Sequence, residues 1–97
     1  MRKEESKFTD KVKADIKKIE GVWFYKTSEI ARRGIPDIIG CIRGKFFALE
    51  IKTELGKLDL LQDHTLILIK ASGGFGAVVR PSNWSGVRAA LLAFSAH

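Results

Sequence analysis

The chain has 97 residues, of which 45% are hydrophobic and 29% charged, and its formal net charge is +6 at pH 7. No apolar run approaches the roughly 20 residues that cross a bilayer, no apolar segment follows the charged N-terminus as a secretory signal requires, and the single cysteine excludes an internal disulfide. We therefore expect one globular domain over residues 1–97, cytoplasmic and without membrane contact, whose basic charge favours a polyanion such as nucleic acid as partner.

The first half of the chain is predicted to form a helix and three strands. Apolar side chains recur with helical spacing at Phe8, Val12, Ile16 and Ile19. Gly21 is placed to end this helix. Strands are expected over residues 22–25, 36–42 and 45–53, with a polar, basic loop over residues 26–34. The pair Arg43-Gly44 predicts a tight hairpin turn in which the glycine takes a positive φ.

The second half is predicted to add a helix, a short strand and a C-terminal helix. The residues from Asp59 to Gln62 have the spacing of a capping box, which predicts a helix from Asp59 to about residue 71. Gly73-Gly74 would close it. A strand over residues 77–79 and an apolar helix from Ser82 onward complete the order α-β-β-β-α-β-α. This order predicts an α/β fold with a mixed central sheet flanked by helices.

The predicted hairpin gathers three residues that can carry chemistry. If Ile42 faces Lys45 across the turn, counting outward places Asp37 directly opposite Glu50. Two carboxylates in that position repel each other, and a bound divalent cation would remove the repulsion. Lys52 lies two residues beyond Glu50 and therefore points to the same face of the strand. The pattern predicts a metal site with a lysine beside it, suited to phosphoryl chemistry.

Two further residues are candidates with structural alternatives. Glu5 extends the apolar stripe of the first helix at its N-terminal end, where it would bind the metal through water or simply complement the helix dipole. Gln62 would hydrogen-bond Lys52 or the attacking water, or act only as a helix cap.

The basic loop before Asp37 supplies candidate contacts to nucleic acid. Lys26, Arg32 and Arg33 are predicted to bind phosphates, with Ser28 as a hydrogen-bond donor. Such contacts hold the backbone of a nucleic acid without reading its sequence. The alternative is an ordinary solvated loop.

The order of these motifs resembles a known family. Gly34-Ile35-Pro36-Asp37, then Glu50-Ile51-Lys52, then Gln62 at the start of a helix resembles the PD-(D/E)XK nuclease superfamily, and within it most closely the VRR-NUC (virus-type replication-repair nuclease) family. The resemblance covers nearly the whole chain, because the leading helix also carries an acid. It implies a restriction-endonuclease-like αβββαβ core with an additional C-terminal helix.

The resemblance also implies an activity and a role for each residue. Asp37, Glu50 and the Ile51 carbonyl match the metal ligands, Lys52 the catalytic lysine, Gln62 the motif glutamine and Glu5 the acid of the first helix, with Glu4 and Asp10 close enough to leave that register open. The implied cofactor is Mg²⁺, with Mn²⁺ as substitute. The implied function is an endonuclease acting on DNA, with branched DNA such as Holliday junctions as a substrate by analogy, in a phage or prophage setting.

Cutting two strands needs two sites, so we expect a homodimer. The C-terminal helix, with Trp84, Val87, Leu91, Leu92 and Phe94, is predicted either to form the dimer surface or to pack into the core. The competing functions are a nicking or flap nuclease, a binding module without catalysis, and a structural subunit that places a partner on DNA.

Overall fold

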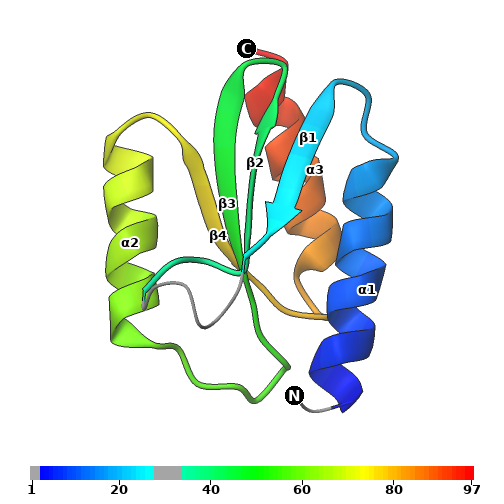
Figure 1. Cartoon of the computed structure of the whole chain (residues 1–97), viewed down its shortest axis with the longest axis vertical. Helices are drawn as coiled ribbons and strands as arrows, with labels where there is room; N and C mark the ends of the chain where they lie inside the picture. Colours follow the sequence, from blue (N-terminus) through cyan, green and yellow to red (C-terminus); the bar gives the residue numbers. More distant parts are fainter. Residues whose placement is uncertain (1–2, 28–33) are drawn as a thin grey trace.

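The computed structural model describes residues 3–27 and 34–97 as a four-stranded sheet with helices on both faces (Figure 1). The elements, in chain order, are α1 (Lys3–Lys17), β1 (Val22–Lys26), β2 (Ile38–Ile42), β3 (Lys45–Ile51), α2 (Leu60–Ala71), β4 (Phe75–Val79) and α3 (Trp84–Ser95). This order is the one predicted from the sequence. Strand ends differ from the prediction by up to two residues, and Lys26, predicted in the loop, is the last residue of β1.

The sheet has the strand order β1-β2-β3-β4, in which only the β3–β4 pair is parallel. The β2–β3 hairpin turns at Arg43-Gly44, and Ile42 faces Lys45 as expected. Both turn residues have a positive φ, 51° at Arg43 and 84° at Gly44. This is the requirement of a two-residue turn that matches the strand twist, so the hairpin register predicted from the sequence is confirmed.

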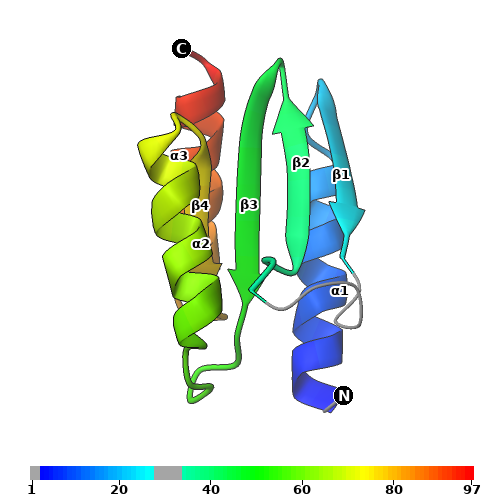
Figure 2. The ribbon, with the colours of Figure 1, turned by 60° about the vertical axis from the view of Figure 1, so that its left-hand side comes forward.

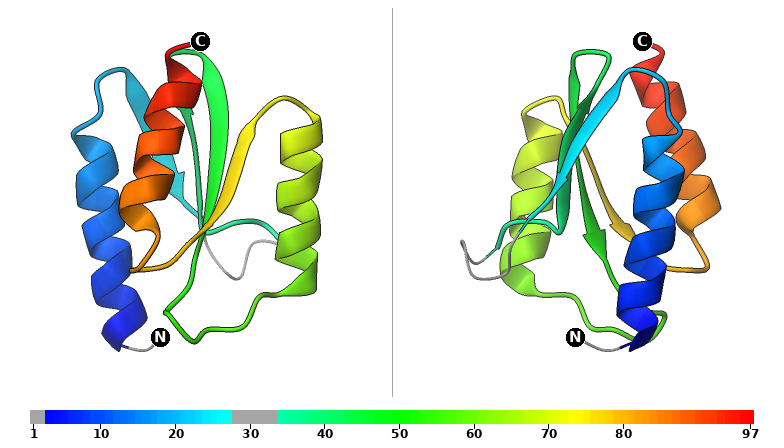
Figure 3. Two further views of the ribbon diagram at one scale, coloured as in Figure 1. Left: turned by 180° about the vertical axis from the view of Figure 1, so that it is seen from behind. Right: turned by 45° about the vertical axis from the view of Figure 1, so that its right-hand side comes forward.

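One face of the sheet carries the hydrophobic core. Alternate residues of β3, which are Phe47, Leu49 and Ile51, are at most 1% exposed. They pack in one cluster with the apolar faces of α1 and α3. Figure 3 shows α1 and α3 side by side on this face, with α2 on the other side of the sheet. Burial of these side chains is the main favourable term in folding the domain.

The opposite face is covered only in part. Leu66 of α2 is buried against Gly76 of β4, where a Cβ would lie 3.3 Å from the leucine side chain. Helix α2 thus packs on β4 and the neighbouring part of β3. Figure 2 looks onto this face, with β1 and β2 in front of α1 and with β3 between β2 and α2.

The structure decides between the two predictions for the C-terminal helix. Trp84 is 4% exposed and Leu91 is fully buried, and both belong to the core cluster. Phe94 packs against Phe75 with ring centroids 5.6 Å apart. The helix therefore packs into the core through these residues, whereas Leu92 is 37% exposed. No helix among residues 3–27 and 34–97 combines the length and apolar character needed to cross a membrane.

Candidate active site

The β2–β3 hairpin brings Asp37 and Glu50 to adjacent positions at one end of the sheet. The outermost pair of the ladder is Ile38 with Leu49, and the next residues outward are Asp37 and Glu50. The Asp37 carboxylate crosses to β3, where Oδ2 accepts a hydrogen bond from the Ile51 backbone N–H at 2.7 Å. Asp37 and Glu50 therefore lie opposite each other, as the sequence predicted, and the Ile51 N–H lies beside them.

Glu50 is a buried carboxyl group with an incomplete set of partners. It is 2% exposed, and its Oε2 lies 3.4 Å from the Lys52 Nζ. Its Oε1 is buried and has no hydrogen-bond partner in the described part of the chain. Burial, followed by the negative charge of Asp37, raises the pKa of Glu50 to about 8. Near neutral pH this carboxyl group holds its proton unless a positive charge arrives.

Each of the two acids has an ammonium group close to it. Lys52 is beside Glu50, with its side chain 17% exposed. Lys26 places its Nζ 4.0 Å from the Asp37 Oδ1 and donates a hydrogen bond to the Thr27 carbonyl. Lys26 was predicted to contact phosphate, and the structure puts it directly at the acidic pair. The site thus combines two carboxylates and two amines, an arrangement suited to an anionic substrate.

The residues present fit a divalent cation. Asp37 and Glu50 offer carboxylate oxygens, and the Ile51 carbonyl belongs to the same residue whose backbone N–H the Asp37 side chain accepts. The unpartnered Glu50 Oε1 is the particular feature that a cation would satisfy. Oxygen ligands of this kind suit Mg²⁺ or Mn²⁺. Among the described residues, no group of three acidic, histidine or cysteine side chains gathers here.

Thr27 and Arg80, which the sequence analysis did not single out, hold the site in place by hydrogen bonds to backbone carbonyls. The Thr27 hydroxyl donates to the carbonyls of Pro36 and Asp37, at 2.7 and 3.1 Å, which ties the start of β2 to the end of β1. The Arg80 guanidinium donates to the Thr53 carbonyl at 2.6 Å. Arg80 directly follows β4, which runs parallel to β3, so both strands end at the same edge. A basic residue directly after this strand is the signal that could have pointed to Arg80 in the sequence.

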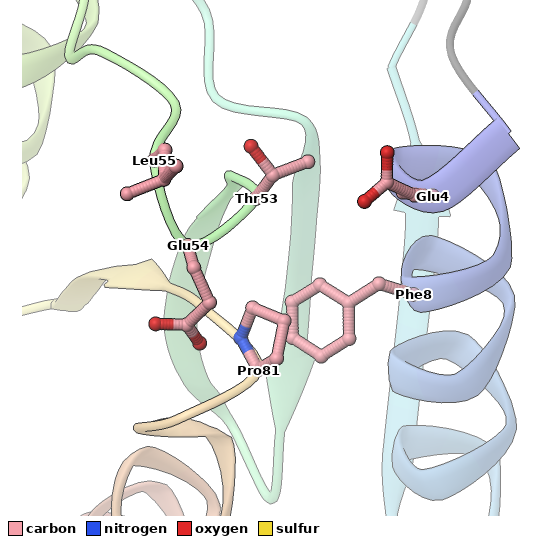
Figure 4. A pocket seen from close by; sticks show the side chains of 6 residues that line it. All are labelled: Glu4, Phe8, Thr53, Glu54, Leu55 and Pro81. Atoms are coloured by element: carbon pink, nitrogen blue, oxygen red, sulfur yellow. The ribbon is translucent and has the colours of Figure 1, made fainter.

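The N-terminal turn of α1 lies near the end of β3. A cavity of about 360 Å³ there is lined by Glu4, Phe8, Thr53, Glu54, Leu55 and Pro81 (Figure 4). Glu4 is the α1 acid that lines this cavity. Glu5 is half-buried, with its carbonyl accepting a hydrogen bond from Thr9, and Asp10 is exposed. The sequence left Glu4, Glu5 and Asp10 as alternatives for the acid of the first helix. Of these, Glu4 lies toward the residues that follow Lys52, at Thr53 to Leu55.

Gln62 and the basic loop complete the predicted set. Asp59 caps α2, and its carboxylate accepts from the backbone N–H of Leu61 and of Gln62. No hydrogen bond joins the Gln62 side chain to Lys52 within residues 3–27 and 34–97. The capping position predicted for α2 is thus present, whereas a catalytic role for Gln62 stays a prediction. Ser28, Arg32 and Arg33 lie outside the described residues.

Comparison with known proteins identifies the fold. No protein-family model and no curated protein matches this sequence. A solved structure described as a VRR_NUC domain is similar over 87% of this chain and 89% of its own length, with a TM-score of 0.69 and 24% sequence identity. The Holliday junction resolvase Hjc of Archaeoglobus fulgidus is similar over 77% of this chain and 67% of its own, with a TM-score of 0.56 and 16% identity. The mixed sheet and flanking helices of the predicted restriction-endonuclease-like fold are confirmed.

Proposed function

We propose that this chain is a metal-dependent endonuclease of the VRR-NUC type that hydrolyses phosphodiester bonds in DNA. The observation that carries the proposal is the buried Glu50, whose Oε1 lacks a partner beside Asp37 and Lys52. A hairpin selected only for stability would not oppose two carboxylates and bury one of them. The fold shared with a VRR_NUC domain and with a junction resolvase supports the same reading.

Asp37, Glu50 and the Ile51 carbonyl would hold the cation, which is Mg²⁺ with Mn²⁺ as substitute. When bound, such an ion polarises a phosphoryl oxygen and lowers the pKa of a water. Lys52 would orient that water and stabilise the negative charge that develops on the phosphoryl oxygens. The water would lose a proton as its oxygen bonds to phosphorus, the bond from phosphorus to the leaving oxygen would break, and the leaving oxygen would take up a proton.

The cations around the site would draw the substrate to it. Lys26 is 26% exposed at its side chain and sits beside Asp37, so it is available to a phosphate at the mouth of the site. Together with the predicted contacts of Ser28, Arg32 and Arg33 and the net charge of +6, it favours backbone binding that weakens with salt. Glu4 would complete the site from α1, in place of the Glu5 favoured by the sequence. Gln62 would support Lys52 or the water.

The preferred substrate is proposed to be branched DNA, cut by a homodimer. Two strands need two catalytic sites, and a four-way junction presents them symmetrically. The branched substrate and the homodimer are proposed by analogy with the fold of a resolvase. The proposed nuclease activity does not depend on either of them.

The test is cleavage of a labelled four-way junction beside matched linear, nicked and flap duplexes, each with Mg²⁺, Mn²⁺ or EDTA. Paired cuts confined to the junction would support a resolvase, and cutting of several substrates would retain the nuclease and reject the resolvase. We expect Glu50→Ala to lose metal binding and cleavage together, by about 10²–10³-fold or more in rate. Lys52→Ala should keep most of the metal affinity and lose rate. Folded protein that binds DNA but never cuts it would contradict the proposal and favour a binding module.

A further inference from the structure

A tight turn that directly follows the proposed active site carries an exposed leucine at its apex. The Gly56 backbone N–H donates to the Thr53 carbonyl at 3.2 Å, so Glu54 and Leu55 are the two central residues of a four-residue turn. Leu55 is 94% exposed and lies across the cavity from Phe8 of α1 (Figure 4). Turns favour Gly, Pro, Asn, Asp and Ser, each for a backbone reason that leucine does not supply. Neither the turn nor the core therefore explains a leucine at this position.

The turn is held in place from the segment between β4 and α3. Arg80 donates to the carbonyls of Thr53 and Glu54, at 2.6 and 3.1 Å. The Glu54 carboxylate in turn accepts a hydrogen bond from the Ser82 backbone N–H. A side chain presented on a turn that is tied at several points loses little freedom when it binds. Leu55 is therefore already positioned for contact with a ligand before the ligand arrives.

The chain places Leu55 close to the bond that the proposed site would cut, and this step rests on the proposed function. Leu55 lies three residues beyond Lys52, which is at most about 10–11 Å of extended chain. Each strand of DNA carries one phosphate every 3.4 Å or so along the helix axis, roughly one per base step. A phosphate held beside Lys52 would therefore have Leu55 within about three base steps of it.

We propose that Leu55 is a wedge that enters the base stack of DNA where stacking is already interrupted, at a branch point or a nick. Burying one leucine side chain is worth roughly ten- to a hundredfold in an equilibrium constant. Opening a base step of intact duplex costs about as much or more, and the cost is least where the base is already unpaired. The wedge would therefore add little on continuous duplex and much at a branch. Leu55 thus selects the class of DNA that the proposed nuclease site receives.

DNA fits a lone projecting leucine better than a partner protein does. A stable protein interface uses about 800 Å² from each partner, whereas one apolar side chain between two bases is enough to kink a duplex. Lys52 and the exposed Lys57 stand on either side of Leu55 in the sequence, and the chain has a net charge of +6. The acid of the turn, Glu54, is engaged by the Ser82 backbone N–H. Charge around the wedge therefore favours a polyanion.

The test compares two exposed leucines in the full chain. Leu60, in the first turn of α2, is 84% exposed, so Leu55→Ser and Leu60→Ser remove the same apolar group from two exposed positions. Leu55→Phe keeps an apolar wedge. A four-way junction, a nicked duplex and an intact duplex each carry 2-aminopurine beside the branch, the nick or the matching position, and its emission rises when it unstacks. Anisotropy in EDTA gives the dissociation constants without cleavage, and circular dichroism checks folding.

We expect the wild type to bind the junction more tightly than intact duplex and to raise the 2-aminopurine emission at the branch. Leu55→Ser should weaken binding to the junction and the nicked duplex by about tenfold or more, and lose the rise in emission. Its binding to intact duplex should hardly change, Leu55→Phe should keep the rise, and Leu60→Ser should match the wild type. Unchanged behaviour of Leu55→Ser, equal losses in both serine variants, or a wild type that leaves the bases stacked overturns the wedge.

Cleavage in Mg²⁺ or Mn²⁺ separates this inference from the proposed nuclease. A wild type that unstacks the branch but cuts no substrate would contradict the proposed function and leave the wedge standing. A wild type that cuts DNA, with Leu55→Ser showing the same preference among the three substrates, would overturn the wedge and leave the nuclease standing.

Discussion

The two faces of the central sheet differ in what their side chains do, and strand β3 displays the difference within seven residues. Toward α1 and α3 it presents Phe47, Leu49 and Ile51, which are fully or almost fully buried among apolar neighbours. Toward α2 it presents the half-exposed Phe46, the buried acid Glu50 and, just beyond the strand, Lys52. One face follows the rule that apolar groups are buried and charged groups are exposed, and the other departs from it at both ends of the strand.

This difference indicates where the molecule gives up stability. Burying Glu50 beside Asp37 costs free energy in the absence of a cation, since its pKa is raised to about 8 by burial and by a like charge. Leaving Trp23, Tyr25 and Phe46 in water also forfeits the gain of apolar burial. Because both costs fall on one face, we attribute that face to binding and the other to folding.

The largest expected effect tests the folding face. Phe47→Ala should lower the free energy of unfolding by about 3–5 kcal/mol, because it leaves a cavity in the core. Phe46→Ala is the matched control, as the same residue type one position away on the other face. At low protein concentration it should cost less than about 1 kcal/mol. Urea unfolding of both variants measures this, and similar losses in the two would contradict the distinction between the faces.

The second prediction concerns the burial of Glu50. Its folded pKa is raised from 4.5 to about 8, so the folded state holds a proton that the unfolded state releases between these values. Without metal, stability of the wild type should therefore fall as the pH rises from 4.5 to 8, and level off above. Glu50→Gln removes this titration and should be more stable than the wild type at pH 8 by roughly 2–4 kcal/mol. Denaturation at several pH values in EDTA checks it, and parallel pH profiles would refute it.

Metal binding should reverse that cost. A cation between Asp37 and Glu50 would replace the proton and supply a partner for the Glu50 Oε1. At 100 times the dissociation constant, Mg²⁺ or Mn²⁺ should raise the free energy of unfolding by about 2.7 kcal/mol. Thermal unfolding with metal or EDTA measures the effect without any substrate. Glu50→Gln should show almost none of it, and an equal rise in that variant would place the metal elsewhere.

The sequence was sufficient to predict that Asp37, Glu50 and Lys52 lie together, because the hairpin obeys strict geometry. A two-residue turn fixes the pairing of Ile42 with Lys45, and the period of two along each strand then places Asp37 against Glu50 and Lys52 on the same face. These steps involve only residues close in the chain. The helix positions followed from periodicity and from the cap at Asp59 in the same way.

What the sequence could not predict depends on packing between distant elements. The rotation and axial position of α1 decide whether Glu4 or Glu5 faces the end of β3, and they are set by core contacts far along the chain. The apolar pattern of α3 was equally compatible with a core or a surface until its contacts with α1 and β4 were known. The exposure of Trp23 likewise depends on which strands α2 covers, and strand alternation alone does not determine this.

The smallest expected effect comes from a polar link between two helices on the folding face. Asp15 of α1 accepts a hydrogen bond from the Trp84 Nε1 of α3 at 2.7 Å, which is the main reason why the pKa of Asp15 is lowered from 3.8. Asp15→Asn keeps an acceptor but loses the charge, so at pH 7 it should cost roughly 1 kcal/mol. The wild type should lose this advantage as the pH falls below 3.8, because the unfolded state takes up the proton first. Unfolding curves at pH 7 and pH 3 should therefore converge for the two proteins, whereas a constant difference would show that the charge of Asp15 contributes nothing to the joining of α1 and α3.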